Sequence, residues 1–241
     1  MARFALIRFP NADELARAAA EEWWGDIATA HQDNQTYHVA LSGGRIALKF
    51  FAAVVELAKV RNVPLHRVHF FWADERCVPP DDPESNYRIA CERLFSPLKL
   101  PCDNIHRIRG EVSAVVAANE AESEICRLAP LNAEGQPVLN LVMLGLGEDG
   151  HVASLFPGET ESIASSPAAY RAITNSPKPP PRRITLGYAA IAAARQVWVL
   201  ASGSGKQNAL RESTKPKGQT PLARVIQSRS QTRIFSDIPV A

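Results

Sequence analysis

The chain has 241 residues, of which 46% are hydrophobic, so it is long enough to bury a sizeable core as one domain spanning residues 1–241. Its 27 basic and 25 acidic residues leave a net charge of +2, which gives little support to binding of nucleic acid or of a membrane surface. No apolar run approaches the ~20 residues of a membrane span. Its 4 cysteines form no C-x-x-C pair, so we expect reduced thiols in a cytoplasmic protein and no metal cage.

Strands and helices are predicted to alternate along the whole chain. Short apolar runs bounded by turns predict the strands, and apolar residues at helical spacing predict the helices between them. Asn11, with Glu14 at the third following position, is typical of a helix start. The predicted strands are Phe4–Arg8, Tyr37–Leu41, Val68–Trp72, Ile105–Ile108, Val138–Leu144, Ala169–Thr174, Ile184–Leu186, Val197–Ala201 and Thr232–Phe235.

One long connection is expected in the middle of this pattern. It is a loop, Ala73–Ser85, followed by a helix from about Asn86 to Phe95. Strands that alternate with helices are typical of a mostly parallel sheet covered on both faces. The chain contains no repeat, low-complexity tract or long linker that would divide it. The sequence therefore predicts a single α/β domain.

The most informative segment is the apolar run ending at Leu144, which continues into a glycine-rich turn with two carboxylates and His151. Ligands of open α/β sheets bind beyond the carboxyl ends of the strands, so an imidazole there is placed for chemistry. Gly145, Gly147 and Gly150 also match the dinucleotide fingerprint G-x-G-x-x-G. That interpretation requires a helix starting in the turn and an acidic residue about 20 positions later. The sequence offers neither, so we reject it.

Two further turns after predicted strands carry polar groups. Ser42-Gly43-Gly44 stands at the start of a predicted helix, where free backbone N–H groups and a hydroxyl are typical of an anion site. The alternative is an ordinary tight turn. Asp74 and Arg76 follow the third predicted strand. Charged side chains at this place either line a cleft or form local ion pairs in a solvated turn.

Two cations complete the set. Lys206 follows a glycine-rich turn at a predicted helix start, where a lysine opposes the helix dipole unless an anion is bound. The spacing differs from that of a P-loop, so a single phosphate suits this turn better than a nucleoside triphosphate. Arg183 precedes another strand. Together these loops predict one cleft with a phosphate-binding end and an acid–base end. We assign no catalytic or metal-binding role to the other five histidines.

These motifs resemble those of the 6-phosphogluconolactonase family. The longest is Gly145-x-Gly147-x-Asp149-Gly150-His151-x-Ala153-Ser154-Leu155-Phe156-Pro157. The shorter motifs Trp72-x-Asp74-Glu75-Arg76-x-Val78-Pro79, Ser85-Asn86-Tyr87-Arg88 and Arg183-Ile184-Thr185-Leu186 also match. The resemblance implies a Rossmann-like three-layer α/β sandwich with a mostly parallel central sheet. It implies hydrolysis of 6-phosphoglucono-δ-lactone in the pentose phosphate pathway, with no cofactor and no metal ion. We expect a monomer or a small homo-oligomer whose only partner is this small-molecule substrate.

The resemblance also implies roles for single residues. His151 would be the general base that activates water, Asp149 would orient its ring, and Arg76 would stabilise the developing oxyanion. Asp74 would line the reacting end of the site. The 6-phosphate would be held by Ser42, Gly43, Gly44, Arg183 and Lys206.

One departure from the family pattern concerns the phosphate loop. After Gly44 the family usually has Ser-Thr-Pro or a similar sequence, whereas here Arg45-Ile46-Ala47 follow. Arg45 either replaces a hydroxyl donor with a full charge or points to solvent.

Two alternative functions stay open. One is an isomerase or deaminase of the same fold acting on a sugar phosphate, although Trp72, Arg76 and the Asp149-Gly150-His151 form favour the lactonase. The other is a non-catalytic sugar-phosphate sensor, a class that normally carries a DNA-binding module; we find no such segment or basic stripe in this sequence.

Overall fold

The computed structural model describes residues 3–239 and has a six-stranded central sheet. The strand order is β1-β9-β8-β5-β2-β3, and every neighbouring pair is parallel. These strands are β1 (Phe4–Arg8), β2 (Tyr37–Leu41), β3 (Val68–Trp72), β5 (Leu141–Gly145), β8 (Gln196–Ala201) and β9 (Thr232–Ser236). The predicted strands in these places are confirmed to within a few residues at their ends.

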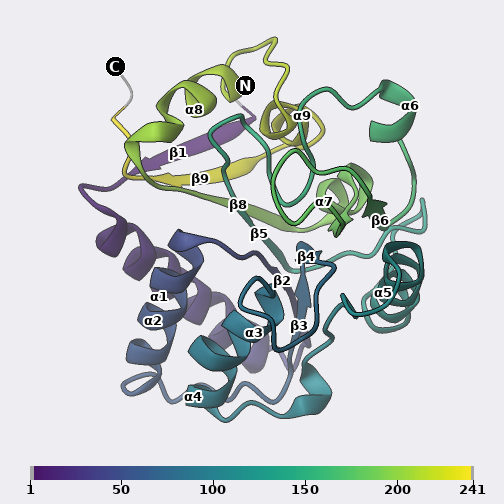
Figure 1. The fold of residues 1–241 in the computed structure, drawn as a ribbon. Helices are drawn as coiled ribbons and strands as arrows, with labels where there is room; N and C mark the ends of the chain where they lie inside the picture. The colour runs from purple at the N-terminus through teal and green to yellow at the C-terminus, as the bar shows by residue number, and fades with distance from the viewer. Residues whose placement is uncertain (1–2, 240–241) are drawn as a thin grey trace.

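Helices cover both faces of the central sheet, as predicted. α1 (Ala12–Gln32) and α2 (Arg45–Ala58) pack together on one side, while α7 (Tyr188–Ala193), α8 (Gln207–Ser213) and α9 (Pro221–Gln227) lie on the other (Figure 1). The α/β three-layer architecture is therefore confirmed. Within residues 3–239, no helix is long and apolar enough to cross a membrane. The remaining helical segments are α3 (Asn86–Ala90), η1 (Cys91–Phe95), α4 (Ser96–Leu98), η2 (Cys102–Asn104), α5 (Ala114–Leu128), α6 (Glu161–Ala164) and η3 (Ser204–Lys206).

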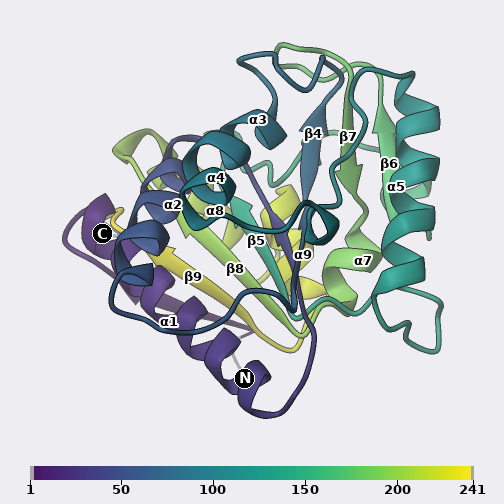
Figure 2. The ribbon, with the colours of Figure 1, turned by 90° about the horizontal axis from the view of Figure 1, so that it is seen from below.

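A second, smaller sheet was not predicted. It has the order β4-β7-β6 and is antiparallel, with strands β4 (Asp74–Arg76), β7 (Arg183–Leu186) and β6 (Tyr170–Ile173). α5 packs against β6 on the outside of this sheet (Figure 2). The expected loop Ala73–Ser85 is thus wrong at its start, because Asp74–Arg76 pairs with β7.

Two other predicted elements differ in the structure. The strand expected over Ile105–Ile108 is reduced to one bridge between Ile105 and Phe70 at the edge of the central sheet. The helix expected over Asn86–Phe95 begins at Asn86 but passes into a π-helical turn, Cys91–Phe95. The bridge at Ile105 lies beyond β3, the edge strand of the central sheet, where pairing is possible on one side only.

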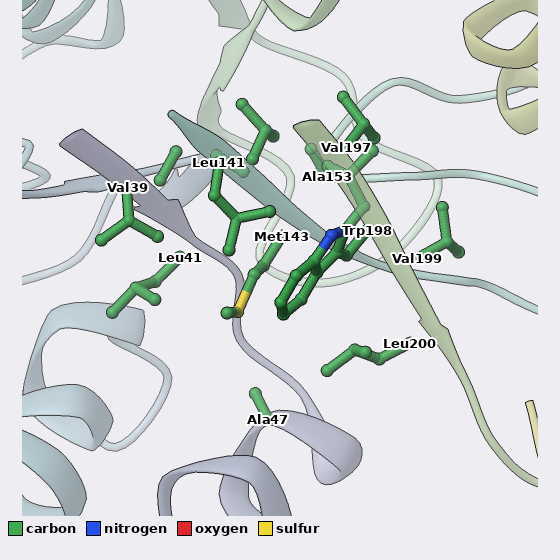
Figure 3. Packing of buried hydrophobic residues seen from close by; sticks show 14 of the residues in the cluster. Val39, Leu41, Ala47, Leu141, Met143, Ala153, Val197, Trp198, Val199 and Leu200 are labelled. Atoms are coloured by element: carbon green, nitrogen blue, oxygen red, sulfur yellow. The ribbon is translucent and has the colours of Figure 1, made fainter. Parts of the chain in front are cut away.

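The core explains why the central strands have continuous apolar sequences. Leu41 on β2, Met143 on β5 and Trp198 on β8 are 1%, 3% and 0% exposed and lie beside one another (Figure 3). Strands of a parallel sheet are buried on both faces, so alternation with polar residues is lost. Burial of each such side chain contributes about 1.5–3 kcal/mol to the free energy of folding. This burial holds the carboxyl ends of β2 and β5 in place.

The strand order places a switch point between β2 and β5. From β2 the chain continues through α2 to β3 on one side, whereas from β5 it continues to β8 on the other. The connections therefore diverge at the carboxyl ends of β2 and β5 and leave a crevice between them, where open α/β sheets bind ligands.

Candidate active site

A cavity of about 260 Å³ lies at this switch point. A larger hollow of about 1030 Å³ opens near Tyr37 and Arg195, at the amino ends of β2 and β8, and contains none of the predicted site residues. We therefore assign the site to the smaller cavity. Eight of the nine predicted site residues line it: Ser42, Gly43, Gly44, Asp74, Arg76, His151, Arg183 and Lys206.

One end of the cavity is built from free backbone amides. In the described part of the chain, the N–H groups of residues 43–46 donate no hydrogen bond. Gly44, with φ of 98°, provides no side-chain cap for α2, and the first turn of this helix contains no acidic residue. Amides at a helix N-terminus, together with the positive end of its dipole, are suited to bind an anion.

The hydroxyl of Ser42 makes a hydrogen bond within the protein, and its predicted role in phosphate binding stays a prediction. Its Oγ donates a hydrogen bond to the carbonyl oxygen of Met143 at 2.8 Å, which ties the loop after β2 to β5. The donors left for an anion are therefore the backbone amides rather than this hydroxyl.

Lys206 and Arg183 line the cavity in different environments. Lys206 ends the turn after β8, and burial, followed by the charge of Arg45, lowers its pKa. Arg183 is only 5% exposed and donates to the carbonyl oxygens of Pro180 at 3.0 Å and Pro179 at 2.8 Å. Much of its hydrogen-bonding capacity thus holds the proline-rich loop Pro177–Pro181, and its predicted role in phosphate binding stays a prediction.

The other end of the cavity contains a histidine–carboxylate pair. His151 Nδ1 lies 2.5 Å from Asp149 Oδ1, and the side chain of His151 is 18% exposed. Lys178, from the proline-rich loop, brings its Nζ to 3.4 Å from the same nitrogen and 3.6 Å from Asp149 Oδ1. Asp149 is not among the residues that line the cavity, and its carboxylate contacts the imidazole at Nδ1.

This geometry favours a neutral imidazole with a free Nε2. An N–H at Nδ1 donates to the carboxylate of Asp149, so the lone pair remains on Nε2. Burial lowers the pKa of His151, and the charge of Lys178 acts in the same direction, although Asp149 opposes both. Burial raises the pKa of Asp149, but the hydrogen bond and charge of His151 outweigh it, so this pKa is lowered. The pair therefore combines an ionised carboxylate with a histidine able to accept a proton near neutral pH.

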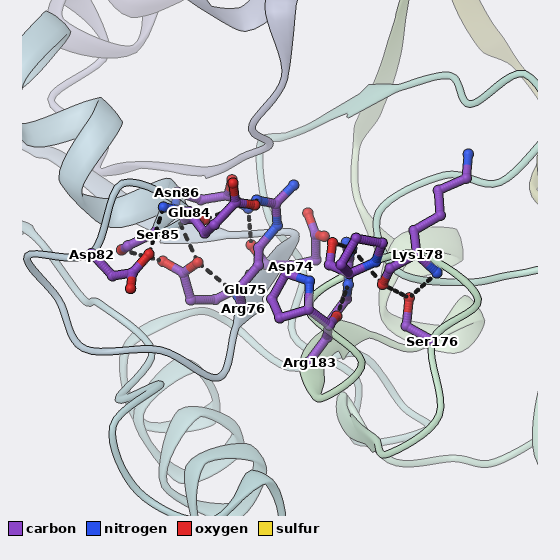
Figure 4. A network of polar contacts seen from close by, with 12 residues as sticks. Asp74, Glu75, Arg76, Asp82, Glu84, Ser85, Asn86, Ser176, Lys178 and Arg183 are labelled. Atoms are coloured by element: carbon purple, nitrogen blue, oxygen red, sulfur yellow. Dashed lines mark hydrogen bonds and ion pairs between the residues drawn. The ribbon is translucent and has the colours of Figure 1, made fainter.

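Asp74 and Arg76 reach the cavity from β4. The carboxylate of Asp74 accepts a hydrogen bond from Ser154 Oγ at 2.7 Å, and both residues are buried. Arg76 donates through Nη1 to the carbonyl oxygen of Glu84 at 2.8 Å, while its buried Nε has no partner in the described structure (Figure 4). Arg76 lines the cavity, and a guanidinium there is suited to stabilise negative charge.

A buried carboxylate supports this strand from behind. Glu75 Oε1 accepts hydrogen bonds from the backbone N–H groups of Arg76 at 2.7 Å and Asn86 at 2.9 Å (Figure 4). Its Oε2 accepts from the N–H of Tyr87 at 2.8 Å and the hydroxyl of Ser85 at 3.2 Å. Burial raises the pKa of Glu75 to about 7, although the backbone hydrogen bonds act in the opposite direction. Glu75 thus fastens α3 to β4.

The sequence reasoning missed the residues that support the site. Lys178 lies in a proline-rich loop that carries no motif, and Ser154 belongs to the long motif after Gly145 but had no predicted role. Glu75 and Asn86 belong to matching motifs, but their contacts appear only in three dimensions. The motif positions were the one available signal. The rejection of the dinucleotide interpretation is supported, because the first helix after Gly145 begins only at Glu161. Within residues 3–239, no group of three or more His, Cys, Asp or Glu side chains is arranged to hold a metal ion.

Comparison with known proteins places these features in a family. The sequence model of the family described as glucosamine-6-phosphate isomerases/6-phosphogluconolactonase matches residues 10–235 of this chain. The chain is 34% identical over 216 residues to 6-phosphogluconolactonase 3, chloroplastic, of Arabidopsis thaliana, covering 87% of this chain and 66% of that protein. It is 36% identical over 213 residues to 6-phosphogluconolactonase of Mycobacterium tuberculosis, covering 84% and 82% of the two chains. Among solved structures, 6-phosphogluconolactonase from Trypanosoma brucei has a TM-score of 0.82 at 27% identity, covering 97% of this chain and 95% of that one.

Proposed function

The chain belongs to the 6-phosphogluconolactonases of the glucosamine-6-phosphate isomerase/6-phosphogluconolactonase family, and we propose that it hydrolyses 6-phosphoglucono-1,5-lactone to 6-phosphogluconate in the pentose phosphate pathway. One observation carries the proposal. The paired imidazole of His151 and the free amides of residues 43–46 line the same cavity. A substrate with a carbonyl at one end and a phosphate at the other suits that arrangement.

The first step is water activation. Neutral His151 accepts a proton at Nε2 from a water molecule, whose oxygen attacks C1 of the lactone. The carboxylate of Asp149 keeps the ring in the required tautomer and stabilises the imidazolium that forms. General base catalysis of this kind contributes about 10²–10⁴-fold to the rate.

The second step is ring opening. The tetrahedral intermediate carries negative charge on the former carbonyl oxygen, which the guanidinium of Arg76 stabilises. When the bond between C1 and the ring oxygen breaks, imidazolium His151 returns its proton to that oxygen, so the base is regenerated. Asp74 lines this end of the cavity and is held by Ser154. No metal ion or cofactor is needed in these steps.

Substrate positioning is assigned to the opposite end. The backbone amides of Gly43 and Gly44, the loop tied down by Ser42, and the ammonium of Lys206 would hold the 6-phosphate. Arg183 would contribute there only with the donor capacity that the proline-rich loop leaves free. Binding the remote phosphate fixes C1 near the base, which makes the attack effectively unimolecular.

The test is hydrolysis of freshly prepared 6-phosphoglucono-1,5-lactone, followed by acid release and corrected for the spontaneous reaction. We expect the wild type to be active and His151→Ala to lose about 10²–10⁴-fold in kcat. His66→Ala is the matched control, because His66 is exposed and lies outside the cavity. Unchanged kcat in His151→Ala would remove the proposed base.

Two further outcomes separate the alternative functions. Release of ammonia from glucosamine 6-phosphate would indicate a deaminase. Tight binding of a sugar phosphate without any turnover would indicate a sensor.

A further inference from the structure

Arg45 has an unusual position beside the phosphate-binding end of the cavity. It is the first residue of α2, it lines the cavity, and it directly follows the turn formed by Gly43 and Gly44. Its side chain is exposed, and among the described residues it makes no ion pair or side-chain hydrogen bond. By contrast Lys49, one turn later on the same helix, pairs with Asp13 at 2.5 Å.

The charge of Arg45 adds to positive charge that is already there. The N-terminus of α2 carries the positive end of the helix dipole, and its first turn has no acidic residue. The ammonium of Lys206 is close enough that Arg45 lowers its pKa, an effect that Glu148 and Asp237 oppose. A cation at a helix N-terminus is unfavourable by itself, so this arrangement calls for a bound anion.

The expected direction of the Arg45 side chain also supports a bound anion. The Cα–Cβ bonds of a helix tilt toward its N-terminus, so a side chain at the first position extends toward the free amides rather than away from them. A guanidinium presents parallel N–H donors that match two oxygens of a phosphate. The amides of residues 43–46 would bind the phosphate oxygens that face the loop. The outer oxygens, which face away from these amides, would be left for Arg45.

We propose that Arg45 binds the outer oxygens of the substrate's phosphate and makes the site selective for dianionic phosphomonoesters over unphosphorylated lactones. The inference deepens the proposed function and rests on it. The residue type matters because a hydroxyl at this position supplies one donor, whereas arginine supplies a full charge and a fork of donors.

The experiment compares Arg45→Ala with Lys49→Ala on two substrates. For 6-phosphoglucono-1,5-lactone we expect Arg45→Ala to raise KM about tenfold with kcat within about twofold, because one charge-assisted contact is lost. For unphosphorylated glucono-1,5-lactone, kcat/KM stays unchanged. The inhibition constant of inorganic phosphate rises by the same factor as KM. Lys49→Ala, whose side chain lies outside the cavity, leaves all these values unchanged.

Several outcomes would overturn the inference. An unchanged KM for the phosphorylated lactone in Arg45→Ala would show that the side chain points to solvent. An equal loss on both lactones would show a general effect on the site. If the wild type does not hydrolyse the lactone at all, the proposed function fails. The inference is then judged by calorimetry with 6-phosphogluconate, where Arg45→Ala must bind about tenfold more weakly than wild type and Lys49→Ala must not.

Discussion

The substitution Gly147→Ala should inactivate the site without changing any reacting group. Gly147 lies in the turn between β5 and His151. A Cβ atom at this position would lie 1.9 Å from His151 Nδ1 and 2.7 Å from Asp149 Oδ1. Ordinary van der Waals contact begins at about 3.4 Å, so the imidazole must move by more than about 1 Å. The hydrogen bond that sets its tautomer is then lost.

The size of the effect follows from this displacement. Misplacing a catalytic group by about 1 Å costs about 10²-fold in rate. We therefore expect kcat to fall about 10²-fold, with KM for the phosphorylated lactone changed only a few-fold, because the phosphate end is untouched. Overpacking costs about 1–3 kcal/mol of unfolding free energy, which a urea titration measures on the same protein.

A double variant separates displacement of the base from other causes. If Gly147→Ala acts only through His151, the double variant with His151→Ala should be no less active than His151→Ala alone. Gly25→Ala is the control, since no atom lies within 4 Å of a Cβ there. Retention of more than half of the wild-type kcat in Gly147→Ala would refute the reasoning, as would a further large loss in the double variant.

Three other predictions concern protonation and buried acceptors. Burial holds the pKa of His151 below 6.5, so kcat/KM should stay level as the pH falls toward 6.5 and should decrease below it, where the base becomes protonated. Asp149→Asn removes a carboxylate that raises this pKa, so the decrease should begin at a lower pH, and a decrease that begins at a higher pH would contradict the assignment. Glu75→Gln places an amide nitrogen against two hydrogen-bond donors, so we expect a loss of about 2–4 kcal/mol in unfolding free energy, and a urea midpoint equal to that of wild type would count against it. Burial lowers the pKa of His38 to about 4, so between pH 6.5 and that value the unfolded chain binds a proton that the folded chain does not, and stability decreases as the pH falls. His38→Asn should flatten this dependence, and equal slopes in the two proteins would show that His38 is not responsible.

The central sheet was predictable because each of its strands is an apolar run. β5 and β8 are buried on both faces and can be recognised without knowing their partners. β4 could not be recognised in this way, since Asp74-Glu75-Arg76 has no apolar pattern and becomes a strand only by pairing with β7. The opposite error occurred at Ile105–Ile108, where the pattern suits a strand but the edge of the sheet offers only one bridge.

The site was predictable as a set of loops but not as a set of contacts. Glycine-rich turns after β2 and β5 indicated where polar groups would gather, and strand order then brought them together. The sequence could not show that Ser42 donates to Met143, or that Arg183 is largely occupied by carbonyl groups. Nor could it place Lys178 against His151, because the two residues meet only through the folding of the proline-rich loop.

A crystal structure with 6-phosphogluconate bound tests the central claim most directly. The account predicts the phosphate on the backbone amides of residues 43–46, with C1 facing the imidazole of His151 and the guanidinium of Arg76 beside its oxygens. A ligand bound with its phosphate at His151, or in the hollow near Tyr37, would contradict it.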